Sequence, residues 1–256
     1  MREQPTFLIS VLVKFAAFLK YMTSLRYKVT IEGAEILKDS SPSLILPNHQ
    51  ALIDPIILMS HIYRDTNAIP VISSTFYDIP LLKSLFTSLG AVRVSNLEAG
   101  SRNLNVLSDI SRSVLKGFRR GKCIVLYPSG QLAAQGYEKI YNKKSTQYIV
   151  SRIPDDVKVL GVRITGLWGS MWSKAKTGKT PNLFIQMLKA IFYVLANLVF
   201  FMPRRTVTIH IEDLTNIAAE KAKLGRKPFN LFLEDFYNQN GEENLKVLNY
   251  FFYTKY

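Results

Sequence analysis

The chain has 256 residues, 48% of them hydrophobic and 12% aromatic, which is enough apolar material for one large folded domain or two small ones. Its formal net charge is +14, so we expect an anionic partner such as a membrane surface, a nucleic acid or a phosphorylated substrate. The single cysteine, Cys123, excludes an intrachain disulfide and a cysteine-based metal cluster, and is compatible with a reducing compartment.

The first apolar segment, Phe7 to Met22, is interrupted by Ser10, Lys14 and Lys20. A lysine inside the apolar run, with no small-residue cleavage site after it, argues against a signal peptide. The segment is also short and charged for a membrane-spanning helix. We therefore expect residues 1–25 to form an N-terminal helix that either lies on the membrane or packs on the domain.

Alternating and apolar runs further along the chain predict strands separated by helices. We expect strands at 27–33, 43–47, 69–72, 90–94, 123–127, 157–165 and 206–213, and helices at 55–63, 79–89 and 97–118. The strand at 123–127 is apolar throughout, as in a parallel sheet covered on both faces. The order predicts an α/β domain over residues 26–256, with a mixed, largely parallel sheet flanked by helices, some of them membrane-associating. The last thirty residues, rich in Phe and Leu, predict a helical cover.

A second apolar segment, residues 181–203, is long enough to cross a membrane. Basic residues stand at both of its ends, whereas a spanning helix usually has them biased to one side. On a helix its polar side chains form one narrow stripe, made by Asn182, Gln186, Lys189 and Asn197. This pattern favours a helix that lies in the membrane interface, or a domain helix with an apolar face exposed for docking. An internal core helix is the remaining alternative.

Two residues that follow the strand at 43–47 are candidates for catalysis. His49 is one of three histidines in the chain, and Asp54 precedes Pro55 at the expected start of a helix. Asp54 is a typical N-cap in this position, and His49 could be an ordinary loop residue. On one helix, residues five apart point about 140° away from each other. The two side chains can therefore meet only if the His49 loop folds back over the start of the helix, where they would make a catalytic base and its orienting carboxylate.

Asn48-His49 followed by Asp54 resembles the first motif of the glycerolipid, or lysophospholipid, acyltransferase family. The resemblance implies that His49 is the general base and that Asp54 holds it. Gly90 to Val94 is similar to the second motif of that family, in which an arginine contacts the phosphate of the acceptor. The resemblance assigns this role to Arg93, and a guanidinium group suits it because it can bind two phosphate oxygens at once.

Tyr127 to Ala133 occupies the place of the third motif, usually an aromatic-proline-glutamate-glycine-threonine-arginine run. Pro128 and Gly130 match, whereas Ser129 replaces the glutamate, Gln131 the threonine and Leu132 the arginine. These changes put the usual acceptor, lysophosphatidic acid, in doubt. The resemblance still implies substrate binding by Ser129, Gly130 and Gln131. With the later run from Arg163 to Ser170, the loop is similar to the acyltransferase half of bacterial bifunctional acyltransferase–acyl carrier protein synthetases, which re-acylates lysophosphatidylethanolamine.

The resemblance implies an O-acyltransferase of phospholipid biosynthesis that moves a fatty acyl group from an acyl thioester to the hydroxyl of a lysophospholipid or related glycerolipid. Acyl-coenzyme A or acyl-acyl carrier protein would be the donor, with no bound cofactor and no metal. The expected partners are the acceptor, the acidic donor and an anionic lipid surface at the cytoplasmic face of a membrane. The altered third motif leaves a catalytically inactive lipid-binding relative as the alternative. Nucleic-acid binding is suggested by charge alone, without a recognised module, and we do not expect it.

Overall fold

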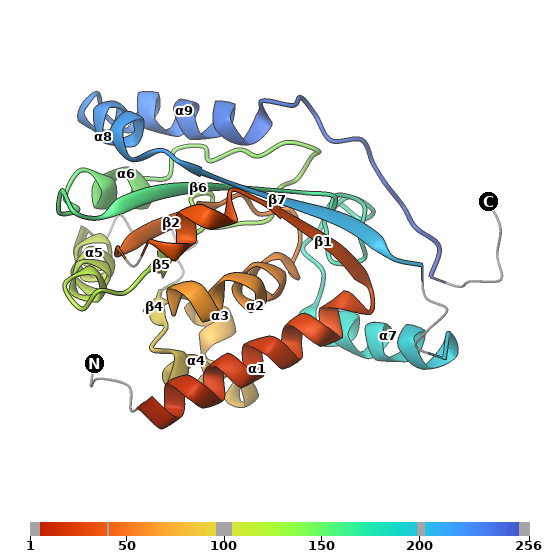
Figure 1. The fold of residues 1–256 in the computed structure, drawn as a ribbon. Helices are drawn as coiled ribbons and strands as arrows, with labels where there is room; N and C mark the ends of the chain where they lie inside the picture. The colour runs from red at the N-terminus through yellow and green to blue at the C-terminus, as the bar shows by residue number, and fades with distance from the viewer. Residues whose placement is uncertain (1–5, 40, 96–103, 199–202, 251–256) are drawn as a thin grey trace.

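The described part of the chain folds around a seven-stranded sheet with helices on both faces, as the computed structural model shows (Figure 1). The structure describes residues 6–39, 41–95, 104–198 and 203–250. The strands are β1 (Tyr27–Glu32), β2 (Ser43–Pro47), β3 (Ile69–Ser73), β4 (Val92–Val94), β5 (Ile124–Val125), β6 (Lys158–Thr165) and β7 (Arg205–Asp213). The helices are α1 (Thr6–Ser24), the 3-10 helix η1 (Ala34–Lys38), α2 (Asp54–Thr66), α3 (Ser74–Tyr77), α4 (Pro80–Leu89), α5 (Leu104–Phe118), α6 (Ser145–Val150), α7 (Leu183–Ala196), α8 (Thr215–Lys223) and α9 (Arg226–Asn238).

The strands are arranged in the order β1-β7-β6-β2-β5-β3-β4. Neighbouring strands are parallel except for β6 and β7, so β1 and β7 run opposite to the rest. The expected α/β fold with a mixed, largely parallel sheet is therefore confirmed. Because β2, β5 and β6 are parallel neighbours, the loops after them leave the same edge of the sheet, which is where open α/β sheets bind ligands.

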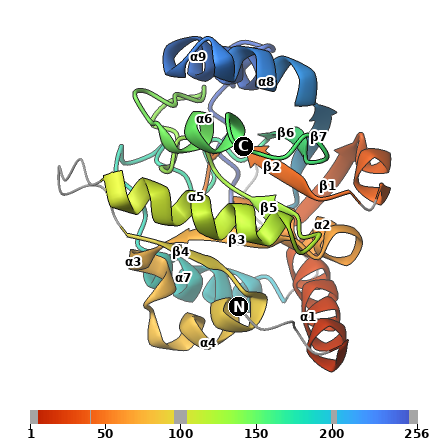
Figure 2. The same ribbon diagram turned by 90° about the vertical axis from the view of Figure 1, so that its left-hand side faces the viewer.

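Each face of the sheet has its own apolar core. Helices α5, α6, α8 and α9 cover one face, where Val114, Phe229 and Leu233 are fully buried. Helix α2 covers the other face with Ile57 and Ile62. Helix α1 packs on the outer side of α2, and α7 lies on the same side of the sheet as α1 (Figures 1 and 2). The central strands β2, β5 and β6 are thus covered on both faces, whereas the alternating exposure along β1 and β7 leaves part of one face open at that end of the sheet.

Helix α7 is shorter than the apolar segment 181–203 in which we expected it. Its 14 residues span about 21 Å, too short for a hydrocarbon core of about 30 Å, and the segment continues into residues 199–202, which lie outside the described part. None of its residues is buried, so α7 is not an internal core helix. Asn197 at the end of the polar stripe is buried and Tyr193, one turn before it, is partly buried, whereas the large apolar side chains are exposed.

The C-terminal end differs from the helical cover expected over the last thirty residues. Helix α9 ends at Asn238, and residues 239–250, here called the C-terminal segment, continue without helix across the sheet edge (Figure 1). The segment lies so close to the loops of this edge that a Cβ atom at Gly136 would overlap the carbonyl oxygen of Glu243. Part of the expected helix 97–118 also lies outside the described residues, which begin again at Leu104.

Candidate active site

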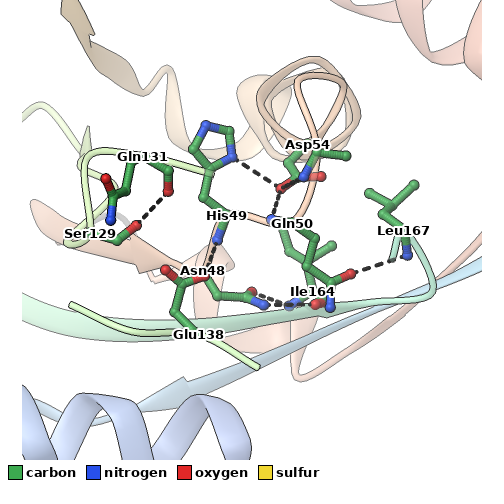
Figure 3. A network of polar contacts seen from close by, with 10 residues as sticks. Asn48, His49, Gln50, Asp54, Ser129, Gln131, Glu138, Ile164 and Leu167 are labelled. Carbon is green, nitrogen blue, oxygen red and sulfur yellow. Dashed lines mark hydrogen bonds and ion pairs between the residues drawn. The ribbon is translucent and has the colours of Figure 1, made fainter. Parts of the chain in front are cut away.

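The loop that carries His49 is anchored to the neighbouring strand before it reaches the histidine. The Asn48 side chain pairs with the backbone of Ile164 on β6, donating to its carbonyl oxygen at 2.9 Å and accepting from its N–H at 2.6 Å. Both polar groups of a buried amide are thereby satisfied, which avoids the cost of an unpaired one. The side chain therefore extends the hydrogen-bond pattern between β2 and β6 beyond the end of β2, and this fixes the position of the backbone that leads into His49 (Figure 3).

His49 and Asp54 meet as the folded-back loop requires. The Nδ1 atom of His49 is 3.1 Å from Oδ2 of Asp54. The same oxygen accepts the backbone N–H groups of Gln50 at 2.6 Å and of Ala51 at 3.0 Å. Asp54 is the first residue of α2 and Ile53 is its N-cap, so the interpretation of Asp54 as an N-cap is wrong. Its carboxylate holds the loop before the helix, not the first turn of the helix.

This arrangement determines which nitrogen of His49 is available for chemistry. Oδ2 of Asp54 receives three donors, so Nδ1 carries the hydrogen in the neutral ring and Nε2 is the basic nitrogen. Figure 3 shows that second ring nitrogen directed away from Asp54. The His49 side chain is 16% exposed and Asp54 is fully buried, so a substrate can reach the base but not its partner. The Tyr127 ring packs against the imidazole with a centroid distance of 4.5 Å.

Burial is the main influence on the charge of Asp54. It raises the pKa of the carboxyl group, and the hydrogen bonds from His49, Ala51 and Gln50 oppose that shift. Its other oxygen, Oδ1, is buried with no hydrogen-bond partner among the described residues. A buried carboxylate that is only partly satisfied interacts strongly with a cation beside it, because little water is present to screen the charge. The pair is suited to stabilise an imidazolium on His49.

The loop between β5 and α6, residues 126–144 and here called the third-motif loop, is attached to His49 through the backbone. Ala133 donates its N–H to the carbonyl oxygen of His49 at 2.7 Å. Ser129 is buried and donates to the carbonyl oxygen of Gln131 at 2.9 Å, and Gly130 turns the chain with a φ of 60°. The structure thus brings Ser129, Gly130 and Gln131 to the His49 loop, with the side chain of Gln131 at the exposed surface.

Arg93 is the expected site residue that the structure places furthest from this loop. It lies on β4, which is separated from β2 by β3 and β5, or roughly 14 Å at about 4.8 Å per strand. Its guanidinium group forms an ion pair with Asp78, with Nε 3.0 Å from Oδ1, and both side chains are about half exposed. The Asp78 carboxylate raises the pKa of Arg93. Arg93 is therefore an accessible cation already paired with an anion.

Sequence reasoning did not single out two acidic residues beside the loop. Glu138 accepts the N–H of His49 at 2.7 Å, and Glu243 from the C-terminal segment bonds to Gln50 at 2.5 Å and to the N–H of Gly166 at 2.8 Å. Both carboxylates line a cavity of about 590 Å³ between the third-motif loop and the C-terminal segment. The buried Arg163, from the place of the fourth motif, lines it too and donates to the carbonyl oxygen of Phe236 at 3.0 Å.

Comparisons with known proteins find matches to the sequence and to the fold. A protein-family model described as Acyltransferase matches residues 28–165, more than half of the chain. The crystal structure of the 1-acyl-sn-glycerophosphate acyltransferase PlsC from Thermotoga maritima has the same fold, with a TM-score of 0.59 over 91% of this chain and 79% of that one, at 16% identity. The search of curated proteins gave no significant match. The family resemblance expected from the motifs is confirmed.

Proposed function

The chain belongs to the acyltransferase family, and we propose that it transfers a fatty acyl group from an acyl thioester to the hydroxyl of a lysophospholipid or related glycerolipid. The observation that carries the proposal is the His49–Asp54 pair at 3.1 Å, with the His49 side chain partly exposed and the Asp54 carboxylate buried. This geometry favours an active enzyme over an inactive lipid-binding relative, because a loop with only a binding role has no need of a charge buried behind a histidine.

In the proposed reaction Nε2 of His49 removes the hydroxyl proton of the acceptor as its oxygen attacks the thioester carbonyl carbon. Asp54 accepts the Nδ1–H hydrogen bond throughout and stabilises the imidazolium ion that forms. The C–O ester bond forms and the C–S bond breaks, and the imidazolium returns its proton to the departing thiolate. General-base assistance of this kind contributes roughly 10²–10⁴-fold to a rate. Transfer is direct, because Ser129 donates to the carbonyl oxygen of Gln131 and pairs with no histidine among the described residues that would make it a nucleophile.

The family resemblance implies the residues that bind the acceptor, and charge supports the choice of donor. We propose that Arg93 binds the phosphate of the acceptor and that the loop of Ser129, Gly130 and Gln131 contacts its glycerol part. The acceptor phosphate would then compete with Asp78 for the guanidinium group. The donor is acyl-coenzyme A or acyl-acyl carrier protein, both of which are acidic and complement a chain of net charge +14. The acyl carrier protein donor and a lysophosphatidylethanolamine acceptor, implied by likeness to the bifunctional branch, stay predictions.

We further propose that two segments attach the protein to an anionic membrane surface. They are residues 1–25 and, within the domain of residues 26–256, residues 181–203. Contrary to the expectation from the sequence, helix α1 is long and apolar enough to cross a membrane by length and composition, the one such helix among the described residues, and only 11% of its apolar window is buried. Helix α7 exposes an apolar face made by Phe184, Ile185, Met187, Leu188, Ile191, Phe192 and Leu195. Contiguous exposed apolar side chains of this kind are uncommon on soluble monomers. Exposed basic residues precede and follow α7, namely Lys176, Lys179 and Arg204, and each adds about 1 kcal/mol near an anionic leaflet.

Vesicle sedimentation tests this attachment. Replacing Phe184 and Phe192 together by serine should weaken binding to vesicles that contain anionic lipid by at least tenfold, because each buried aromatic ring contributes roughly 1.5–3 kcal/mol. Replacing Leu224, an exposed apolar residue on the other side of the sheet, is the matched control and should change nothing. Equal binding by the double variant and the wild type would refute the assignment of α7.

The function itself is tested by product analysis. Purified protein on vesicles is incubated with a panel of lysolipids and with both thioester donors, and the lipids formed are identified by mass spectrometry. We expect one diacyl product class above the background of a His49→Ala variant. His210→Ala is the matched control, because His210 is a strand-face residue paired with Glu32 outside the site, and it should stay active. Vesicle binding without a product for any pair would support the inactive relative instead.

A further inference from the structure

The third-motif loop has no carboxylate at residue 129, where the family resemblance leads us to expect a glutamate. The folded chain nevertheless places a carboxyl group beside that position. Glu138, further along the same loop, is only 4% exposed, and its side chain lies directly below the His49 loop in Figure 3. A carboxyl group in such a place costs folding free energy unless its partners offset the loss of water.

The chief partner of Glu138 is the backbone of the proposed catalytic base. Oε2 of Glu138 accepts the N–H of His49 at 2.7 Å. On the opposite side of the residue, the carbonyl oxygen of His49 accepts the N–H of Ala133 at 2.7 Å. Both backbone polar groups of His49 are therefore bonded to one loop, which fixes the peptide planes on either side of the imidazole. Asp54 then has only the ring to orient.

Glu138 is itself held in place by helix α9. Its N–H donates to Oδ1 of Asn238 at 2.8 Å, and its carbonyl oxygen accepts from Nδ2 of Asn238 at 2.9 Å. Asn238 is the last residue of α9, which packs on the sheet through Phe229 and Leu233. The carboxyl group is thus attached at its backbone to a packed helix, so its position does not depend on the mobility of an exposed loop.

The surroundings of Glu138 favour the neutral acid. Burial raises its pKa to about 8, the negative charges of Asp54 and Glu234 add to that shift, and hydrogen bonds from His49 and Ser129 oppose it. Oε1 of Glu138 is buried with no hydrogen-bond partner among the described residues, and Glu138 as a residue lines the 590 Å³ cavity.

We propose that Glu138 supplies from a different point of the loop the carboxyl group that the third motif lacks at Ser129, and that it is the positioning residue that holds the His49 backbone for proton transfer. The inference rests on the proposed function for its kinetic consequences. Its structural content is independent of that function, because it concerns the hydrogen bond between Glu138 and His49 alone.

Three variants test the proposal in the full chain on vesicles. Glu138→Ala removes the acceptor of the His49 N–H, and kcat should fall 10- to 100-fold with KM for the lysolipid unchanged, because misplacement of a base by about 1 Å costs on this order. Glu138→Gln keeps an acceptor oxygen, so kcat should stay within about threefold of the wild type. The exchange variant Ser129→Glu with Glu138→Ser returns the carboxyl group to the usual motif position and should recover activity relative to Glu138→Ala.

A wild-type kcat in Glu138→Ala, a raised KM with unchanged kcat, an equal loss in Glu138→Gln, or no recovery in the exchange variant would each overturn the proposal. Proton NMR separates its failure from that of the proposed function. The Nδ1–H resonance of His49, assigned by its loss in His49→Ala, should shift or broaden in Glu138→Ala and be retained in Glu138→Gln. This readout needs no turnover, so an unaltered resonance in Glu138→Ala contradicts the positioning role even if no substrate is ever found.

Discussion

Replacing Asp54 by asparagine should separate the electrostatic role of this residue from its structural role. An asparagine oxygen in the place of Oδ2 can still accept from the His49 ring and from the Gln50 and Ala51 N–H groups, so the loop keeps its hydrogen bonds. The charge is lost. At the observed 3.1 Å between Nδ1 and Oδ2, a unit charge pair with an effective dielectric constant near 20 is worth about 5 kcal/mol. That corresponds to a fall in kcat of roughly 10⁴-fold.

Stability should move in the opposite direction. Because burial raises the pKa of Asp54, its charged form is disfavoured in the folded state, and a neutral isostere removes that cost. We therefore expect the thermal midpoint of Asp54→Asn at pH 7 to equal or exceed that of the wild type while acyl transfer is nearly abolished. Asp65→Asn, an exposed position on the same helix, is the control and should change neither quantity. A variant that keeps kcat within tenfold, or loses activity only through unfolding, would refute the reasoning.

Three further predictions concern the surroundings of the pair. In initial-rate kinetics, Arg93→Ala should raise KM for a phosphate-bearing acceptor about tenfold with kcat unchanged. Asp78→Asn should lower the same KM, because it releases the guanidinium group of Arg93. An unchanged KM in both variants excludes Arg93 from the acceptor site. Burial raises the pKa of Glu138 to about 8, so the stability that its neutral form contributes is lost as pH rises from about 5 to 8. The thermal midpoint of the wild type should therefore fall over this range, and that of Glu138→Gln should not. Parallel plots of midpoint against pH for the two proteins would contradict this prediction. Gly136→Ala should cost about 1–3 kcal/mol in denaturant unfolding, because its Cβ would overlap the Glu243 carbonyl oxygen, and a neutral result would mean that the C-terminal segment can shift.

The part of the site that was predictable from the sequence is local. The apolar run that ends at Pro47 and the start of α2 at Asp54 placed a loop between a strand and a helix, and helix geometry required His49 to fold back if the pair was to meet. The strand-helix alternation gave the layered α/β fold for the same reason, since hydrophobic periodicity reports which face of an element is buried. The polar stripe of α7 was also visible.

The part that was not predictable depends on contacts between distant segments. Glu138 and Glu243 reach the His49 loop only because β5 and the C-terminal segment meet at one sheet edge, which no spacing in the chain reveals. One signal was present in the sequence, because Glu138 follows a third motif that lacks its usual glutamate at residue 129. The sequence alone did not show that the Glu138 side chain contacts the His49 loop. Nor could the stripe of α7 indicate which side faces the protein. The ion pair between Arg93 and Asp78 likewise depends on how β4 and the end of α3 are arranged.

The most direct test of the account is acyl transfer by His49→Ala in a protein that is still folded and still bound to vesicles. The wild type and the variant are compared in a single-turnover assay with a radiolabelled acyl thioester and the acceptor identified from the lysolipid panel, with His210→Ala as the control. The account predicts that the variant loses at least 10²-fold in rate while its vesicle binding and thermal midpoint match those of the control. Transfer at the wild-type rate by His49→Ala would contradict it.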